Sequence, residues 1–371
     1  MIIGIPKEIK NHEYRVGMTP SSVHEMVAHG HQVLVQSEAG IGIGATDDDY
    51  HEVGADIIDN ASNIFANAEM IIKVKEPQAI ERAMLREGQI LFTYLHLAPD
   101  PEQTKDLMDS GAICIAYETV TSPFGGLPLL APMSKVAGRL AVQAGAHCLE
   151  QPQGGLGMLL GGVPGVAPAK VVILGAGIVG THAAHIAVGM GADTWILDNN
   201  SESLERHWRQ FGDTTNSIFS NKNALEQHVL EADLVIGGVL IPGAEAPKLV
   251  TREMISKMKK GAVVVDVAID QGGCFATSHA TTHAEPTFVV DDVVHYCVAN
   301  MPGAVPKTST YALNNVTLPF ALNIANKGVT QALLDDSHLR NGLNVYAGKV
   351  TYKEVARELG YDYVPATEVL E

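Results

Sequence analysis

Basic residues are scarce in this sequence of 371 residues, which has 25 lysines and arginines against 42 aspartates and glutamates. The formal net charge of −17 gives a surface that repels nucleic acid and anionic membranes. We therefore expect no nucleic-acid or membrane partner. A small anionic substrate would need arginine or lysine placed locally, so basic residues in unusual settings are informative.

The sequence also has few cysteines, no long apolar run and no recognisable leader. None of the four cysteines has the spacing of a metal or redox site: Cys114, Cys148, Cys274 and Cys297. This favours free thiols in a reducing compartment. The apolar runs are far shorter than a membrane span, and no basic segment precedes the first of them. These absences predict a cytoplasmic protein.

The chain length and the alternation of strands with helices indicate two successive α/β folds. A helix is predicted to begin at Pro20, with Thr19 as its N-cap. Ligands of such sheets bind beyond the carboxyl ends of the strands, where Lys75 and His96 are expected. The predicted strands include Met70–Val74, Gln89–His96, Ala112–Tyr117, Leu234–Leu240, Ala262–Ala268 and Phe288–Val290.

A dinucleotide-binding fingerprint lies near the middle of the chain. The β-branched run Lys170–Leu174 predicts a buried strand, which leads directly into Gly175-Ala-Gly177-Ile-Val-Gly180 and a helix. The three glycines permit, in order, a tight turn, close approach of a pyrophosphate and close helix–strand packing. Asp198 ends the next predicted strand, where a carboxylate binds a ribose 2′-hydroxyl and repels a 2′-phosphate. This predicts NAD rather than NADP.

Four residues outside the fingerprint are candidates for chemistry. Arg15 and Lys75 could hold a small carboxylate, although any single Arg or Lys is more often a surface charge. His96 could transfer protons, or it could be a hydrogen-bonded structural histidine. Asp270, after the predicted strand Val263–Val267, could orient water or ammonia, or it could cap the following turn.

No metal site is predicted. His279 and His283 have a spacing that could suit a metal on a helix, but Pro286 and the intervening Ala-Thr-Thr argue against a helix there.

Short blocks along nearly the whole chain resemble the alanine dehydrogenase family, in the same order. Each block is short, but their co-occurrence is specific. They are Gly4-Ile-Pro-Lys-Glu-Ile-Lys-Asn11, Arg15-Val-Gly-Met-Thr-Pro20, Val74-Lys-Glu-Pro77, Leu95-His-Leu-Ala98, Gly161-Gly-Val-Pro-Gly-Val166, Asp266-Val-Ala-Ile-Asp-Gln-Gly-Gly273 and Asn300-Met-Pro-Gly-Ala-Val-Pro306.

The resemblance implies reversible, NAD-dependent oxidative deamination of L-alanine to pyruvate and ammonia by a homohexamer. It implies two Rossmann-like domains, with the NAD domain (129–306) inserted between the two halves of the catalytic domain (1–128 and 307–371). Arg15 and Lys75 match substrate-binding positions, and His96 and Asp270 match the catalytic pair.

The resemblance and the fingerprint together imply a set of NAD-contacting positions. They are Ser134, Gly175, Gly177, Ile178, Val179, Gly180, Asp198, Ser203, Ser220, Val239, Leu240, Val267, Ala268, Ile269, Asp270, His279, Val298, Ala299, Asn300 and Met301.

Some positions depart from the family pattern. The family commonly has arginine in place of His279 and often a basic residue in place of Ser203, so we expect modestly weaker NAD binding here. Some members bind magnesium through an acid and a histidine near residue 325. Asn323 and Lys327 stand at those positions, so this ion is not expected.

Two other functions fit parts of the sequence. The nucleotide-binding subunit of a proton-translocating transhydrogenase shares the fold and part of the N-terminal pattern, but Lys75, His96 and Asp270 disfavour it. An NAD sensor without catalytic activity would need only the fingerprint.

Overall fold

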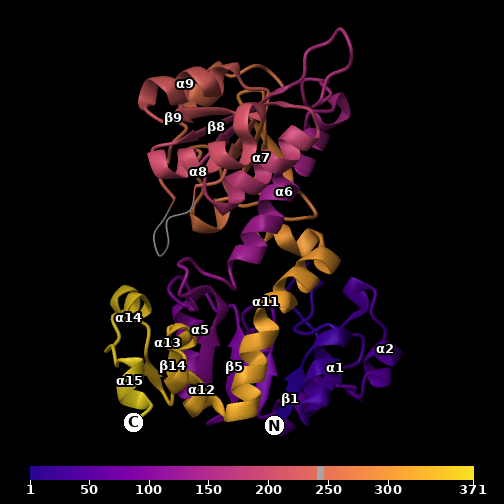
Figure 1. The fold of residues 1–371 in the computed structure, drawn as a ribbon, viewed down its shortest axis with the longest axis vertical. Coiled ribbons are helices and arrows are strands. Elements are labelled where there is room, and N and C mark those ends of the chain that lie inside the picture. Colours follow the sequence, from indigo (N-terminus) through magenta and orange to yellow (C-terminus); the bar gives the residue numbers. More distant parts are fainter. Residues whose placement is uncertain (240–245) are drawn as a thin grey trace. The chain divides into compact units, whose positions relative to one another are not determined.

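The structure is a computed structural model of this chain, and it describes residues 1–239 and 246–371. These residues form two compact units, one from Met1–Met133 and Gly303–Glu371 and the other from Ser134–Pro302. Both ends of the chain therefore build the first unit, whose segments run from indigo to purple and from orange to yellow in Figure 1. No helix among the described residues is long and apolar enough to cross a membrane.

The described part of the first unit contains an eight-stranded sheet in the order β15-β14-β6-β5-β4-β1-β2-β3. Neighbouring strands from β6 to β3 pair in parallel, and the last two strands of the chain add an antiparallel edge. The strands are β1 (Ile2–Ile5), β2 (Gln32–Gln36), β3 (Asp56–Ile58), β4 (Met70–Ile72), β5 (Ile90–Thr93), β6 (Ile113–Ala116), β14 (Leu343–Tyr346) and β15 (Lys349–Val350).

Polar caps fix where several helices of this unit begin. Thr19 accepts a hydrogen bond from the backbone of Ser22 and Pro20 opens α1, as predicted, while Asp100 caps α5 before Pro101. The helices are α1 (Pro20–Ala28), α2 (Asp47–Glu52), α3 (Ala61–Asn67), α4 (Ala79–Arg82), α5 (Pro101–Asp109), α11 (Pro306–Lys327), α12 (Val329–Asp335), α13 (Ser337–Arg340), α14 (Lys353–Leu359) and α15 (Ala366–Val369). The unit boundary falls within a further helix, α6 (Ala131–Cys148).

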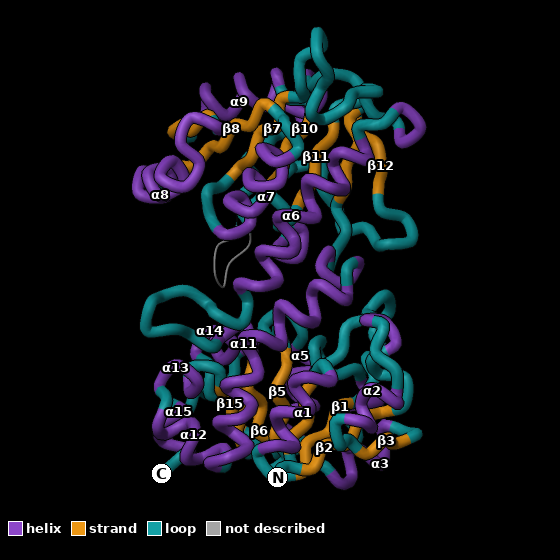
Figure 2. The backbone as a smooth tube through the Cα atoms, turned by 45° about the vertical axis from the view of Figure 1, so that its right-hand side comes forward, coloured by secondary structure: helices purple, strands orange, loops and turns teal. Residues whose placement is uncertain are grey.

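The second unit repeats this architecture. Its described residues form a seven-stranded sheet in the order β12-β13-β11-β10-β7-β8-β9, parallel except for β12. Helices flank the strands in each unit (Figure 2). The elements are β7 (Lys170–Leu174), α7 (Ile178–Gly189), β8 (Asp193–Asp198), α8 (Ser201–Phe211), β9 (Asn216–Phe219), α9 (Lys222–Glu231), β10 (Leu234–Gly237), α10 (Arg252–Lys257), β11 (Val263–Asp266), β12 (Thr287–Val290) and β13 (Val293–Tyr296).

The strand order places a topological switch point in each sheet. The first strand of each unit, β1 or β7, pairs with the second strand on one side and with the fourth on the other. The chain leaves these neighbouring strands in opposite directions, which opens a crevice at their carboxyl ends. The two switch points therefore lie beyond β1 and β4 in one unit and beyond β7 and β10 in the other.

The central strands of each sheet are buried on both faces, which is why they read as apolar runs. In the first unit Ile71, Leu91 and Cys114 lie side by side on neighbouring strands and pack on Phe65 of α3. All four are fully buried, and complete burial of an isoleucine, leucine or phenylalanine side chain is worth about 1.5–3 kcal/mol. This packing gives the strand ends a rigid base.

Some predicted strands are too long, and five strands of the described residues were not predicted, namely β3, β9, β13, β14 and β15. The predicted strand Gln89–His96 ends at Thr93, and the one predicted over Ala262–Ala268 ends at Asp266. β13, which pairs with β12 as an antiparallel hairpin, was not expected. Beyond the end of each shortened strand a carboxylate accepts the backbone N–H groups, as described below.

Candidate active site

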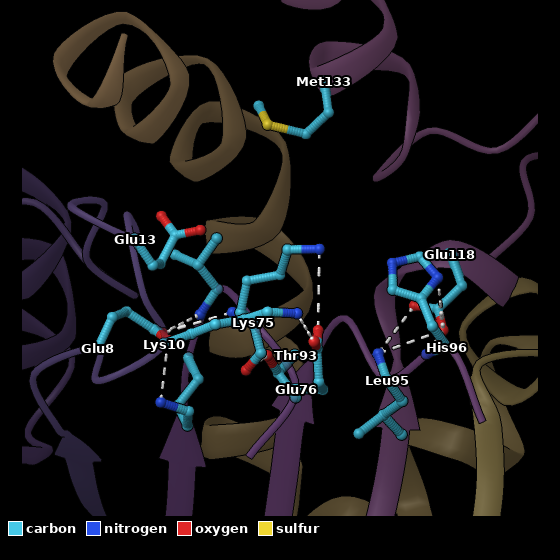
Figure 3. Close-up of polar contacts among 12 residues, drawn as sticks. Glu8, Lys10, Glu13, Lys75, Glu76, Thr93, Leu95, His96, Glu118 and Met133 are labelled. Carbon is cyan, nitrogen blue, oxygen red and sulfur yellow. Dashed lines mark hydrogen bonds and ion pairs between the residues drawn. The ribbon is translucent and has the colours of Figure 1, made fainter. Parts of the chain in front are cut away.

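The substrate and catalytic residues predicted for the first unit lie beyond strands that are neighbours in its sheet. Lys75 follows β4 and His96 follows β5, while Arg15 lies in the segment between β1 and α1. Because the carboxyl ends of these parallel strands lie on the same side of the sheet, the structure brings the three residues to the side of this unit that has the switch point. Figure 3 shows Lys75 and His96 above the ends of their strands.

The guanidinium group of Arg15 is buried and bound to a carboxylate of its own loop. Its Nε lies 2.7 Å from Glu13 Oε1 and its Nη2 lies 2.6 Å from Oε2, which is a two-bond pairing. Its Nη1 donates to Met133 Sδ at 3.1 Å. Burial alone would lower the pKa of Arg15, but Glu13 more than offsets this and holds the pKa above its ordinary value.

Lys75 is held in place through its backbone. Its carbonyl accepts a hydrogen bond from Thr93 Oγ1 at 3.0 Å, and its amide donates to Glu8 Oε1 at 3.4 Å. Its ammonium nitrogen lies 3.8 Å from Glu76 Oε2. Burial would raise the pKa of Glu76, but Lys75 and Lys10 hold it below the ordinary value, so this carboxylate stays charged.

A buried ionic cluster supports the same strand end. Lys73 is fully buried, and its Nζ contacts Glu8 Oε2 at 3.0 Å and Glu81 Oε1 at 2.7 Å. Burial opposes the charge on Lys73, but the two carboxylates raise its pKa. The other oxygen of Glu8 accepts the Val74 amide at 2.7 Å. The cluster therefore fixes the backbone that presents Lys75.

His96 has a left-handed backbone, with φ of 50°. Such a conformation is uncommon for a residue other than glycine and needs support from its surroundings. Glu118, just after β6, supplies this support because its Oε1 accepts the His96 amide at 2.6 Å and the Leu95 amide at 3.2 Å. The same oxygen lies 3.9 Å from His96 Nδ1.

The imidazole ring of His96 is itself oriented. It stacks on Tyr94 with an interplanar angle of 6°, and the Tyr94 hydroxyl donates to the Leu129 carbonyl at 2.6 Å. The His96 side chain remains 45% exposed, so it is positioned yet open to solvent. A histidine in such a setting can exchange protons with a small molecule.

In the second unit the fingerprint has the backbone that a dinucleotide requires. Gly175 has φ of 100°, and a Cβ on Gly180 would lie 1.8 Å from the Gly175 carbonyl oxygen. Around Gly177 no atom lies within 4 Å of where a Cβ would be, and no side chain caps α7 at this residue. The first N–H groups of α7 are therefore available to an anion.

Most of the other predicted cofactor positions follow the carboxyl ends of the parallel strands of the same sheet, whereas Ser203 lies in the first turn of α8. The positions that end or follow β8, β9, β10, β11 and β13 are, in the same order, Asp198, Ser220, Val239, the run Val267–Asp270 and the run Val298–Met301. Ser134 lies in the first turns of α6, and the His279 ring stacks on Phe288 with 3.7 Å between ring centroids. Leu240 lies outside the described residues.

Asp270 lies in a short 3-10 turn, Ile269–Gln271, and is exposed. The turn is closed by Asp266, the last residue of β11, which is fully buried. Asp266 Oδ1 accepts the Ala268 amide at 3.2 Å, and its Oδ2 accepts the Cys274 amide at 3.0 Å. One carboxylate thus ties together both ends of the loop that carries Asp270.

The sequence predictions missed the roles of three acidic residues, Glu8, Glu118 and Asp266. Each accepts backbone N–H groups at the strand end that carries a predicted substrate-binding or catalytic residue. Their positions next to strand ends are visible in the sequence, but their hydrogen-bond partners are not. Among the described residues no group of three or more histidine, cysteine, aspartate or glutamate side chains is arranged to hold a metal ion.

Comparisons with known proteins agree with this geometry. The alanine dehydrogenase/PNT N-terminal domain matches residues 4–137, and the alanine dehydrogenase/PNT C-terminal domain matches residues 141–353. An alanine dehydrogenase of Halomonas elongata is 59% identical over the full length of both chains.

Solved structures extend the similarity to the fold. A structure of an L-alanine dehydrogenase, 52% identical, superposes with a TM-score of 0.94 and covers 97% of this chain and 99% of its own. A transhydrogenase from Sinorhizobium meliloti is 25% identical, with a TM-score of 0.81 over 95% of this chain and 99% of its own. The order of motifs, the strand topology and these matches have one explanation: the chain belongs to the alanine dehydrogenase/PNT family.

Proposed function

We propose that this protein catalyses the NAD-dependent, reversible oxidative deamination of L-alanine to pyruvate and ammonia. The observation that carries this proposal is the 59% identity with an alanine dehydrogenase along the full length of both chains. The strand-end placement of Lys75 and His96 and the open backbone at Gly177 support it. In this proposal residues 1–128 and 307–371 bind the substrate, and residues 129–306 bind NAD.

Arg15 and Lys75 bind the substrate carboxylate in this proposal. Glu13 engages Nε and Nη2 of Arg15, whereas Nη1 donates to the thioether of Met133, which is a weak acceptor. A substrate carboxylate would replace this sulfur as the partner of Nη1. Lys75 would add a point charge from the neighbouring strand end, so the carboxylate is held by two cations.

The residues of the second unit fit NAD. The exposed Gly177 leaves room for the pyrophosphate, and the uncapped N-terminus of α7 offers N–H donors to it. Asp198 accepts the Ala176 amide at 2.6 Å and so lies beside the glycine turn, where it would accept the ribose 2′-hydroxyl. When bound at these residues, NAD would supply the hydride acceptor of the reaction.

His96 and Asp270 handle the protons of the hydrolytic half of the reaction. Loss of hydride from the neutral amine of the substrate would leave an iminium ion, which water attacks at carbon. His96, oriented by Tyr94 and Glu118, would take a proton from this water and return it to the departing ammonia. Asp270, on its fixed turn, would hold the water or the ammonia in place.

We also propose that the protein is a cytoplasmic homohexamer. The four free cysteines support this location, because thiols stay reduced in the cytoplasm. Light scattering after size-exclusion chromatography tests the assembly, because a hexamer has six times the mass of the 39.4 kDa chain. A smaller particle at working concentration would refute the hexamer.

The reaction is tested by following NADH absorbance with pyruvate present, with and without ammonia. We expect NADH oxidation only when both substrates are present. A transhydrogenase subunit would need NADP as acceptor and no ammonia, and an NAD sensor would bind NADH without consuming it.

The role of His96 is tested in the same assay. His96→Ala should abolish turnover while NADH binding stays close to that of the wild type. His24→Ala, which removes an exposed histidine from α1 of the same unit, is the matched control and should retain full activity. Full turnover by His96→Ala would exclude His96 from the mechanism.

A further inference from the structure

Beyond the carboxyl end of β8 a chain of hydrogen bonds leads from Asp198 to an arginine on α8. Asp198 Oδ1 accepts the Asn200 amide at 2.8 Å, and Asn200 Oδ1 accepts the Ser203 amide at 3.2 Å. Ser203 Oγ in turn accepts a hydrogen bond from Arg206 Nη2 at 3.0 Å. The guanidinium of Arg206 is thus drawn back toward the first turn of α8.

This contact changes the interpretation of the serine at position 203. The sequence alone suggests that Ser203 removes a positive charge from the cofactor site. In the structure the Ser203 hydroxyl instead holds the guanidinium of Arg206, which comes from the next turn of the helix. A cation is therefore held at the first turn of α8, although it is supplied by a different residue.

A second arginine on the same helix provides a contrast. Arg209 Nε pairs with Glu205 Oε1 at 2.9 Å, so a neighbouring carboxylate neutralises its charge. For Arg206 the described residues include no carboxylate within ion-pair distance. Both side chains are exposed. Of these two arginines, Arg206 is the one that contacts the first turn of α8 and that is not paired with a carboxylate among the described residues.

We infer that Arg206 is a specificity-determining residue at the adenosine end of the dinucleotide site. This inference rests on the proposed binding of NAD. Asp198 favours a ribose 2′-hydroxyl and repels a 2′-phosphate, whereas an arginine nearby attracts a phosphate through charge-assisted hydrogen bonds. Arg206 therefore lessens the discrimination against NADP that Asp198 alone would impose, and it adds modestly to the affinity for NAD.

Equilibrium binding tests this inference without reference to turnover. NADH and NADPH are titrated separately into the wild type, Arg206→Ala and Arg209→Ala by isothermal titration calorimetry at low ionic strength. Loss of one phosphate-directed arginine should weaken NADPH binding by about tenfold, and NADH binding by about threefold or less. Arg209→Ala removes the same charge from the same helix and should leave both affinities within about twofold of the wild type.

The outcomes separate this inference from the proposed function. If the wild type binds NADH but Arg206→Ala behaves like Arg209→Ala, the inference is wrong and the proposed function stands. An equal loss of affinity for NADH and NADPH in Arg206→Ala would also refute a role at the 2′ position. If the wild type binds neither nucleotide, the proposed cofactor is wrong, and this inference fails with it.

Discussion

Replacing Asp266 with asparagine should uncouple the loop of Asp270 from the sheet that supports it. The Asp266 carboxylate is fully buried and accepts the amides of Ala268, Cys274 and Phe275. Asparagine has nearly the same shape but has one acceptor oxygen and turns an NH₂ group toward backbone donors. The variant therefore tests the charge and the hydrogen bonds with little change in volume.

The structure sets the size of the expected effect. A hydrogen bond to a charged group contributes about 1.5–3 kcal/mol, and a buried donor left without a partner costs about 1–3 kcal/mol. Loss of one to two such bonds predicts a decrease of about 3 kcal/mol in the free energy of unfolding. Displacement of a catalytic group by about 1 Å can cost about 100-fold in rate, so we expect kcat to fall at least tenfold.

Asp233→Asn is the matched control. Asp233 is also a buried aspartate of the second unit, accepting the Lys170 amide at 2.7 Å and the Lys259 ammonium at 2.7 Å. It precedes β10 and so lies at the amino ends of the parallel strands, whereas Asp266 lies at their carboxyl ends. We expect it to lower stability but not kcat, when both variants are assayed at temperatures where they are fully folded.

Denaturant unfolding and the pyruvate- and ammonia-dependent oxidation of NADH provide the two measurements. Loss of stability without loss of kcat in Asp266→Asn would show that Asp266 supports the fold alone. An equal fall in kcat in Asp233→Asn would show that the rate responds to general loosening of the unit. Either result would refute the argument that Asp266 positions Asp270.

Three further predictions concern other polar groups of the two units. Lys73→Met leaves two buried carboxylates without their cation, so guanidinium titration should show a loss of about 3–5 kcal/mol, and a loss below about 1 kcal/mol would contradict the buried cluster. Burial lowers the pKa of His207 from 6.5 to about 4. Because the unfolded chain binds this proton more readily, stability should fall by up to about 3 kcal/mol as pH drops from 6.5 toward 4. His207→Gln should reduce the slope of pH-dependent unfolding by this amount, while the remainder includes His182, whose pKa is also lowered to about 4 by burial. An unchanged slope would refute the contribution of His207. Glu118→Gln weakens the support of His96, so kcat should fall about 10- to 100-fold while calorimetry shows unchanged NADH binding, and an unaltered kcat would refute this positioning role.

Local sequence signals were sufficient to predict the general architecture. The β-branched run Lys170–Leu174, the glycines that follow it and Asp198 predicted a strand, a turn and a second strand, all of which the structure contains. The alternation of apolar runs with helices likewise predicted the parallel sheets. These features follow from residues close together in the sequence, whose conformational preferences act locally.

The groups that support the site could not be predicted in this way. Glu118 binds the amides of Leu95 and His96 from the turn after β6, and Glu8 reaches the amide of Val74 from the segment after β1. Such contacts depend on strand order and register, which no short pattern encodes. The left-handed backbone of His96 had no sequence signal, because glycine or asparagine is the usual residue in that conformation.

The binding of loop amides to buried carboxylates has a consequence for solvent exchange. Loops without regular secondary structure usually exchange their amide hydrogens quickly, since their N–H groups face water. The amides of Val74, Leu95 and Cys274 lie outside the strands but donate to Glu8, Glu118 and Asp266. Deuterium should therefore enter these positions slowly, and a map of the slowest amides in each unit would extend from the sheet into the loops that carry Lys75, His96 and Asp270.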